Sequence, residues 1–126
     1  MSNHGKFHWN ELMTWDAGKA KAFYGETLGW TFDDVAMPQG FTYTIAKAGG
    51  EMAGGIMQMN EQQHQGLPEH WFSYIETDDI DARCAKVEAA GGSVINGPFD
   101  VETVGRFAIV RDANGAMIGW ITPEQR

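Results

Sequence analysis

The sequence is short of cysteine, of cationic residues and of long apolar runs, and each shortage excludes a class of protein. Its single cysteine, Cys84, rules out an intrachain disulfide and gives no sign of an oxidising compartment. Nine lysines and arginines stand against 17 aspartates and glutamates, so the net charge is −8 and a basic face for nucleic acid is not expected. No apolar run approaches the ~20 residues that cross a bilayer. Because the N-terminus also lacks the apolar segment of a signal peptide, we expect a cytoplasmic protein with no membrane partner.

An internal repeat is the first positive feature of the chain. When the sequence is shifted by 62 positions, the residues that meet an identical one without a gap include His8 and His70, Trp9 and Trp71, Asp16 and Asp78, Ala20 and Ala82, and Gly29 and Gly91. Each copy begins with a strand-like run and an acid, continues with a helical pattern that ends at glycine, and closes with three more strand-like runs. A period of this kind predicts two copies of one structural unit.

The two expected helices cover residues 16–29 and 78–91. Each has apolar side chains at helical spacing, an aspartate that can cap its N-terminus and a glycine where it ends. Cys84 lies on the apolar stripe of the second helix, so we expect it in the core.

The strand-like runs complete a repeated βαβββ order. The turn signals "KAGGE" and "RDANGA" make the last two strands of each copy a hairpin. We expect one α+β domain over residues 1–126, with module one at about 6–59, a polar linker at about 60–69 and module two at about 70–123. The two modules should form a curved eight-stranded mixed sheet with helices outside, and its concave side is a natural pocket.

Three segments give the chain a family resemblance: "KAKAFYGETLGW", "TDDIDARCAKVEAAGG" and "VRDANGAMIGW". They resemble the vicinal oxygen chelate superfamily, which includes glyoxalase I, bleomycin resistance proteins, fosfomycin-modifying enzymes and extradiol dioxygenases. More narrowly, "WNELMTWD", "PEHWFSYIETDD" and "GPFDVETVGRFAIVRDANGA" resemble a glyoxalase-like subgroup related to lactoylglutathione lyase. The resemblance covers nearly the whole chain and implies the glyoxalase-like fold. It implies no single reaction, because the superfamily contains lyases, transferases, oxygenases and binding proteins.

The resemblance also locates the positions where a metal would be held. In the superfamily's metal enzymes, His or Glu projects from the first and last strands of each half into the cup. The equivalent positions here are Trp9, the segment from Gly55 to Met57, Phe72 and Gly119. None of these side chains suits nickel, zinc, manganese or iron. We therefore expect no metal ligand and no cofactor, with a divalent metal on non-standard ligands as the alternative.

Glu11 and His70 are the candidate catalytic residues. Glu11 shares a strand face with Trp9, and desolvation in an apolar cup raises the proton affinity of a carboxylate, which suits a general base. A ligand clamp and a partner for a cation are further roles open to Glu11, and an acid at the edge or rim, paired with Arg106 or Arg111, is its structural alternative. His70 shares a face with Phe72, and a hydrogen-bonded histidine at the start of a strand is the other reading of His70.

The candidate ligand-binding residues are Trp9, Tyr43, Phe72, Tyr74 and Arg106. The tyrosine hydroxyls can orient a ligand or lie at the sheet surface. Arg106 can meet an anionic ligand or form a salt bridge at the rim. His8 is adjacent to Trp9 and should face the opposite way.

Together these features predict a small-molecule-binding protein of the glyoxalase and bleomycin-resistance type, with an aromatic cup and without the usual metal ligands. A metal-independent enzyme falls within this prediction. The alternative is a divalent-metal-dependent glyoxalase-like lyase or isomerase whose ligands are His70 and Glu11 or residues of a second subunit. A third reading is a small dimeric accessory or regulatory domain with a vestigial cup. The expected partners are a small organic ligand and a second copy of the chain in a homodimer.

Overall fold

The computed structural model describes residues 2–124, which form two compact units. Unit 1 contains the chain up to Trp9 and from Ser73 onward, and unit 2 is Asn10–Phe72. The elements are β1 (Phe7–Thr14), α1 (Ala17–Leu28), β2 (Thr31–Ala36), β3 (Thr42–Ala48), β4 (Glu51–Gln58), α2 (Glu61–His64), β5 (His70–Glu76), α3 (Ile80–Cys84), β6 (Ser93–Val101), β7 (Gly105–Arg111) and β8 (Met117–Pro123). The strands form one eight-stranded mixed sheet in the order β2-β3-β4-β1-β5-β8-β7-β6, so the expected fold class is confirmed.

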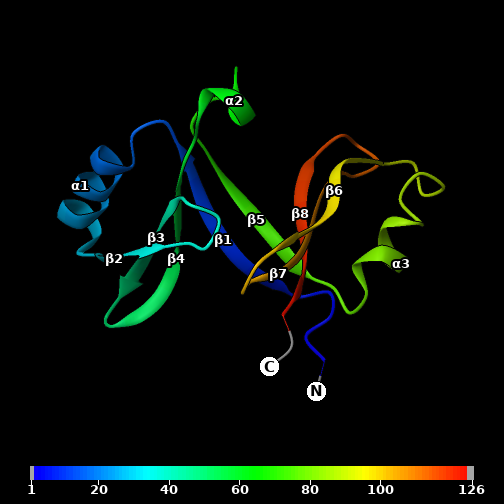
Figure 1. The fold of residues 1–126 in the computed structure, drawn as a ribbon, viewed down its shortest axis with the longest axis horizontal. Helices are drawn as coiled ribbons and strands as arrows, with labels where there is room; N and C mark the ends of the chain where they lie inside the picture. The colour runs from blue at the N-terminus through cyan, green and yellow to red at the C-terminus, as the bar shows by residue number, and fades with distance from the viewer. Residues whose placement is uncertain (1, 125–126) are drawn as a thin grey trace. The chain divides into compact units, whose positions relative to one another are not determined.

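In unit 2, strand β4 lies between β1 and β3 and pairs with β1 in parallel and with β3 antiparallel. Helix α1 runs beside these strands (Figure 1). It begins and ends as expected: the Asp16 carboxylate accepts a hydrogen bond from the Lys19 backbone N–H at 3.0 Å, and Gly29 adopts a left-handed conformation with φ of 73°. The centre of one face of the strands is buried and carries Leu12, Thr14, Thr44, Ala46 and Ile56.

In unit 1, helix α3 packs on strands β6, β7 and β8 (Figure 1). The core contains Ile80 and Val87 from the helical segment and Ala108 and Val110 from β7, with Cys84 packed against it. Burial raises the pKa of the Cys84 thiol, as expected for a thiol in the core.

Helix α3 is much shorter than the sequence predicted. It ends at Cys84, and the chain continues in turns as far as Gly91, which has φ of 98°. The backbone bonds in this stretch include Lys86 N–H to the Arg83 carbonyl and Val87 N–H to the Cys84 carbonyl. Hydrogen bonds between residues three apart are typical of 3₁₀ turns and not of the α-helix. The apolar spacing therefore located the helical segment correctly but did not show where its α-helix ends.

The expected linker contains a short helix, α2, that the sequence analysis did not predict. The Asn60 side chain caps it by accepting a hydrogen bond from the Gln63 backbone N–H at 2.8 Å. No helix among residues 2–124 is long and apolar enough to cross a membrane.

Candidate functional site

A buried carboxylate with a tyrosine partner lies on one strand face of unit 2. Glu11 on β1 is only 8% exposed, and its Oε1 accepts a hydrogen bond from the hydroxyl of Tyr43 on β3 at 2.7 Å. Strand β4 runs between these two strands, and its residue opposite Glu11 is Gly55. The Tyr43 side chain therefore crosses β4 above a residue that has no side chain.

We call this side of the strands the Glu11 face. It carries Glu11, Met13, Tyr43, Ile45, Gly55 and Met57, by strand register and by the Glu11–Tyr43 bond. Met13 and Met57 are paired across β1 and β4 and are half-buried. The centre of the opposite face of the same strands is buried. The Glu11 face is thus a mainly apolar, partly exposed surface with one buried carboxylate.

His70 is a hydrogen-bonded histidine at the start of a strand, which was the alternative to its catalytic role. Its Nδ1 lies 2.7 Å from the carbonyl oxygen of Pro68, and its ring contacts the ring of Phe72 at 6.3 Å between centroids. The ring contact places His70 and Phe72 on the same side of β5, as strand alternation predicted. Trp71, between them, contacts Tyr24 of helix α1 through an indole N–H to hydroxyl distance of 3.3 Å.

In unit 1, aromatic rings occupy the positions that correspond to the Glu11 pair. Tyr74 on β5 is opposite Gly119 on β8, and its ring meets the edge of Phe107 at 5.5 Å. Phe107 in turn stacks on Phe99 at 5.9 Å. Gly119 is also opposite Ile109, just as Gly55 is opposite Ile45. The structural repeat thus has a carboxylate bonded to a tyrosine in unit 2, and a tyrosine packed on two phenylalanine rings in unit 1.

Arg106 is engaged by two aspartates. Its guanidinium binds both carboxylate oxygens of Asp81 at 2.9 and 3.0 Å and one oxygen of Asp100 at 3.1 Å. The bonds to Asp81 and then Asp100 raise the pKa of Arg106, and the bond from Arg106 lowers the pKa of Asp81. This is the salt bridge that the sequence analysis gave as the alternative to an anion-binding role.

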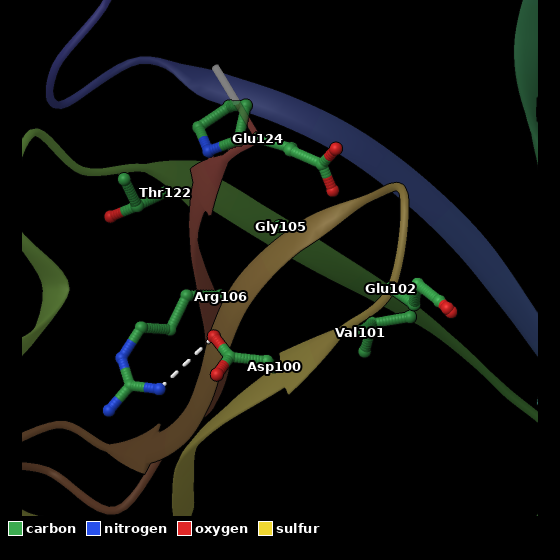
Figure 2. Close-up of a pocket in the computed structure, with 8 residues that line it drawn as sticks. Asp100, Val101, Glu102, Gly105, Arg106, Thr122 and Glu124 are labelled. Carbon is green, nitrogen blue, oxygen red and sulfur yellow. Dashed lines mark hydrogen bonds and ion pairs between the residues drawn. The ribbon is translucent and has the colours of Figure 1, made fainter. Parts of the chain in front are cut away.

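Figure 2 shows Arg106 turned toward Asp100. Both residues line a hollow of about 320 Å³ in unit 1. The hollow is lined by Asp100, Val101, Glu102, Gly105, Arg106, Thr122, Pro123 and Glu124. Of the candidate site residues, only Arg106 lies there, so the hollow does not bring the candidate residues together.

The remaining candidate, Trp9, is half-buried in unit 1. Its neighbour His8 lies 3.2 Å from the carboxylate of Glu76 on β5, which gives His8 a structural ion pair when it is protonated.

The fold agrees with comparison to known proteins. The sequence profile of the Glyoxalase/Bleomycin resistance protein/Dioxygenase superfamily matches residues 6–119. The chain belongs to this superfamily. Membership confirms the resemblance seen in the sequence, and it extends over both units.

Several superfamily members are similar to this chain. "Putative glyoxylase CFP32" of Mycobacterium tuberculosis is 41% identical over 94% of this chain and 44% of its own length. "Anthracycline biosynthesis protein DnrV" of Streptomyces peucetius is 34% identical over 86% of the chain and 43% of its own length. The chain thus spans less than half the length of these curated relatives. "Probable lactoylglutathione lyase" of Vibrio cholerae is 30% identical over 99% of the chain and 95% of its own length.

A solved structure of a Streptomyces coelicolor methylmalonyl-CoA epimerase variant has a TM-score of 0.69 to this chain. It is 16% identical and covers 97% of this chain and 99% of its own. At this identity the likeness shows the shared fold.

The side chains at the superfamily's ligand positions do not fit a divalent metal in this member. Among residues 2–124, no three His, Cys, Asp or Glu side chains gather closely enough to hold one. Two of those positions, Gly55 on β4 and Gly119 on β8, have no side chain. The residues opposite them are Glu11 and Tyr74. A divalent metal needs several converging nitrogen or oxygen ligands, which these pairs do not supply.

The sequence analysis missed the role of Gly55. It treated this residue only as a position without a metal ligand. A glycine in the interior of a strand signals the close approach of another group, and "AGGI" in β4 carried that signal.

Proposed function

We propose that the chain binds a small planar organic molecule with a cationic or hydrogen-donating group on the Glu11 face, without a metal. The observation that carries this proposal is the pairing of the buried Glu11 carboxylate with the Tyr43 hydroxyl at 2.7 Å. A carboxylate removed from water is stabilised by donors, and a ligand ammonium or N–H group is such a donor.

The surroundings of the pair suit an aromatic or apolar ligand body. On the Glu11 face, Met13 and Met57 have flexible thioether side chains and Ile45 has an aliphatic one. Methionine adapts its shape to different ligands and makes favourable contacts with aromatic rings. The net charge of −8 adds a general attraction for cations.

The relatives support a polycyclic ligand. One of them is named for anthracycline biosynthesis, and anthracyclines are planar aromatic compounds that carry an amino sugar. Because this chain spans less than half of that protein, the likeness supports a class of ligand and not a shared activity.

The pair also has the parts for proton transfer. In a bound carbonyl compound, the Tyr43 hydroxyl can turn from Glu11 to donate its proton to the carbonyl oxygen. The released Glu11 carboxylate can then accept a proton from the carbon next to the carbonyl. Return of the proton to a neighbouring atom completes an isomerisation. The enzymatic form of the proposal is therefore a metal-independent isomerase or lyase.

A metal-dependent glyoxalase-like lyase or isomerase is the second candidate. It is favoured by 30% identity to the Vibrio cholerae protein named as a lactoylglutathione lyase over nearly the full length of both chains. In this chain it would need His70 and Glu11 among its ligands.

We also propose that two copies of the chain associate. Phe23 and Leu28 of α1 are 58% and 59% exposed, and Trp71 is 43% exposed. The rings of Phe23, Tyr24 and Trp71 contact one another in series, so these side chains form one apolar patch on unit 2. Exposed patches of this kind mark association surfaces.

A thermal-shift screen tests the binding proposal, because a ligand that binds only the folded state raises the melting temperature. Protein purified without chelator is first analysed for metal content and then screened, before and after chelator treatment, with daunorubicin, 9-aminoacridine and S-lactoylglutathione. The proposal expects the aromatic cations to stabilise the metal-free protein. A stoichiometric divalent metal that is lost on replacing His70 would instead establish the second candidate.

A further inference from the structure

The path of the Tyr43 side chain depends on a single glycine. A Cβ built on Gly55 would collide with the Tyr43 hydroxyl and would lie 2.8 Å from its Cε2 atom. Carbon atoms do not approach so closely, so any side chain at position 55 would displace the Tyr43 ring. The hydrogen bond from Tyr43 to Glu11 therefore requires glycine at this position.

The position of Gly55 gives this requirement a chemical meaning. It lies on β4 directly opposite Glu11, the residue to which the Tyr43 hydroxyl donates. Here the tyrosine hydroxyl from β3 fills the space that a side chain on β4 would take, and it donates to Glu11.

We propose that Gly55 is a positioning residue whose missing side chain seats the Tyr43 hydroxyl on Glu11, so that this pair selects ligands by the charge of their polar group. The inference rests on the proposed binding function and deepens it by naming the selected ligand class: planar molecules with an ammonium or another N–H donor. Anionic groups such as carboxylates and phosphates are disfavoured, because like charges repel strongly near a buried carboxylate.

The corresponding place in unit 1 supports the assignment. Gly119 on β8 is opposite Tyr74 on β5, just as Gly55 is opposite Glu11. The ring that contacts Tyr74 is Phe107. A phenylalanine has no hydroxyl to donate, and no carboxylate stands opposite Gly119. The carboxylate and hydroxyl pair that we propose to select ligands by charge is therefore the one in unit 2.

Gly55→Ala and Gly54→Ala form a matched pair of variants. Alanine at position 55 meets the movable end of Tyr43, so the backbone can stay in place. Alanine at position 54 instead places its Cβ 2.9 Å from the backbone oxygen of Asn10, away from Tyr43. Gly54→Ala therefore perturbs the strand and leaves the Glu11–Tyr43 pair, while Gly55→Ala separates the pair.

The test compares dissociation constants for 9-aminoacridine, a planar cation, and acridine, its neutral analogue at pH 8. In Gly55→Ala and in Tyr43→Phe, Glu11 loses the hydrogen bond that holds its carboxylate in place for the ligand. We therefore expect the preference for the cation to fall about tenfold, with acridine affinity unchanged. Gly54→Ala should keep the preference even if it lowers the melting temperature. In a Tyr43→Ala background, adding Gly55→Ala should change nothing further. An equal loss of affinity for both probes in Gly55→Ala would overturn the proposal.

A second readout needs no ligand. The chain has three tyrosines, so ¹³C-labelled tyrosine gives a spectrum that Tyr43→Phe assigns. The Cζ resonance of Tyr43 should move in the same direction in Glu11→Gln and in Gly55→Ala. The first change replaces the carboxylate acceptor by a weaker neutral amide oxygen, and the second separates the hydroxyl from its acceptor. If wild type binds neither probe while these shifts appear, the binding function fails and the positioning role of Gly55 stands. If Gly55→Ala leaves the resonance in place, the positioning role is wrong.

Discussion

The hydroxyl of Tyr43 reaches across strand β4 and donates to Oε1 of Glu11 at 2.7 Å. The two residues lie on strands that are not neighbours, so the bond links β1 to β3 over the bare backbone of Gly55. It combines a buried carboxylate with a donor of fixed direction, and the proposals for binding and for proton transfer depend on this pair.

Replacing Glu11 by glutamine tests the charge of the site. Glu11→Gln keeps the size of the side chain and removes its negative charge, so we expect affinity for a planar cation to fall by about tenfold or more. Fluorescence titration with 9-aminoacridine measures the change. Asp34→Asn is the control, since Asp34 bonds Thr44 and Lys21 instead of the Glu11 face. An equal loss in both variants would mean that net charge, and not the site, sets affinity.

Removal of metal should leave binding intact. Because no three candidate ligands gather among residues 2–124, dialysis against a chelator should change the affinity for the aromatic probe by less than twofold. His70→Asn should behave in the same way, since the His70 ring is held at the Pro68 carbonyl. Isothermal titration before and after dialysis measures both effects. Recovery of lost binding on adding Zn²⁺ or Ni²⁺ would contradict the expectation.

The Asp78–Arg83 pair predicts a pH dependence of stability. The bidentate hydrogen bonds from Arg83, at 3.0 and 2.9 Å, lower the pKa of Asp78 from 3.8 to about 2. A carboxylate with a lowered pKa stabilises the folded state above its unfolded pKa, and that contribution is lost as the pH falls from about 4 to about 2. Urea unfolding of wild type and Arg83→Gln should therefore differ above pH 4 and converge near pH 2. A difference in unfolding free energy between the two proteins that stays constant over this pH range would show that the pair does not cause the pH dependence.

The buried face of unit 2 should dominate its stability. Ile56 is 1% exposed, so Ile56→Ala should cost about 2–5 kcal/mol of the free energy of unfolding through lost burial and a cavity. Val35 is 41% exposed, and Val35→Ala should cost about 0.5 kcal/mol or less. Denaturant titration compares the two variants. Equal costs would show that the packing of this face differs from the structure.

The apolar patch on unit 2 predicts self-association. Phe23→Ser removes the exposed ring that contacts Tyr24 and should shift a homodimer toward monomer. Sedimentation velocity over a range of concentrations measures the shift, with the exposed Met52→Ser as a control away from the ring cluster. Wild-type protein that sediments as a monomer at every concentration would contradict the homodimer.

Much of the fold was predictable because local signals agreed with one another. Asp16 and Gly29 marked both ends of α1, and the glycine turns marked both hairpins. The end of α3 was not predictable, because apolar spacing is satisfied by the tight turns after Cys84 as well as by an α-helix. Helix α2 was missed because a polar segment gives no periodic signal, and only its capping residue, Asn60, marked it.

The candidate site was predictable residue by residue but not as a pair. Strand alternation placed His70 with Phe72 correctly, and Glu11 and Tyr43 were each named as candidates. Their bond depends on the order β3-β4-β1, a tertiary feature that spacing along the chain does not contain. Arg106 shows the same limit, since its partner Asp81 comes from a helix 25 positions away.

The most direct test of the account is a titration of chelator-treated, metal-free protein with 9-aminoacridine, followed for wild type and Glu11→Gln side by side. The account predicts binding of one molecule per Glu11 face in wild type and affinity about tenfold weaker or more in the variant. Absence of binding in the metal-free wild type, together with binding that appears on adding a divalent metal, would contradict it.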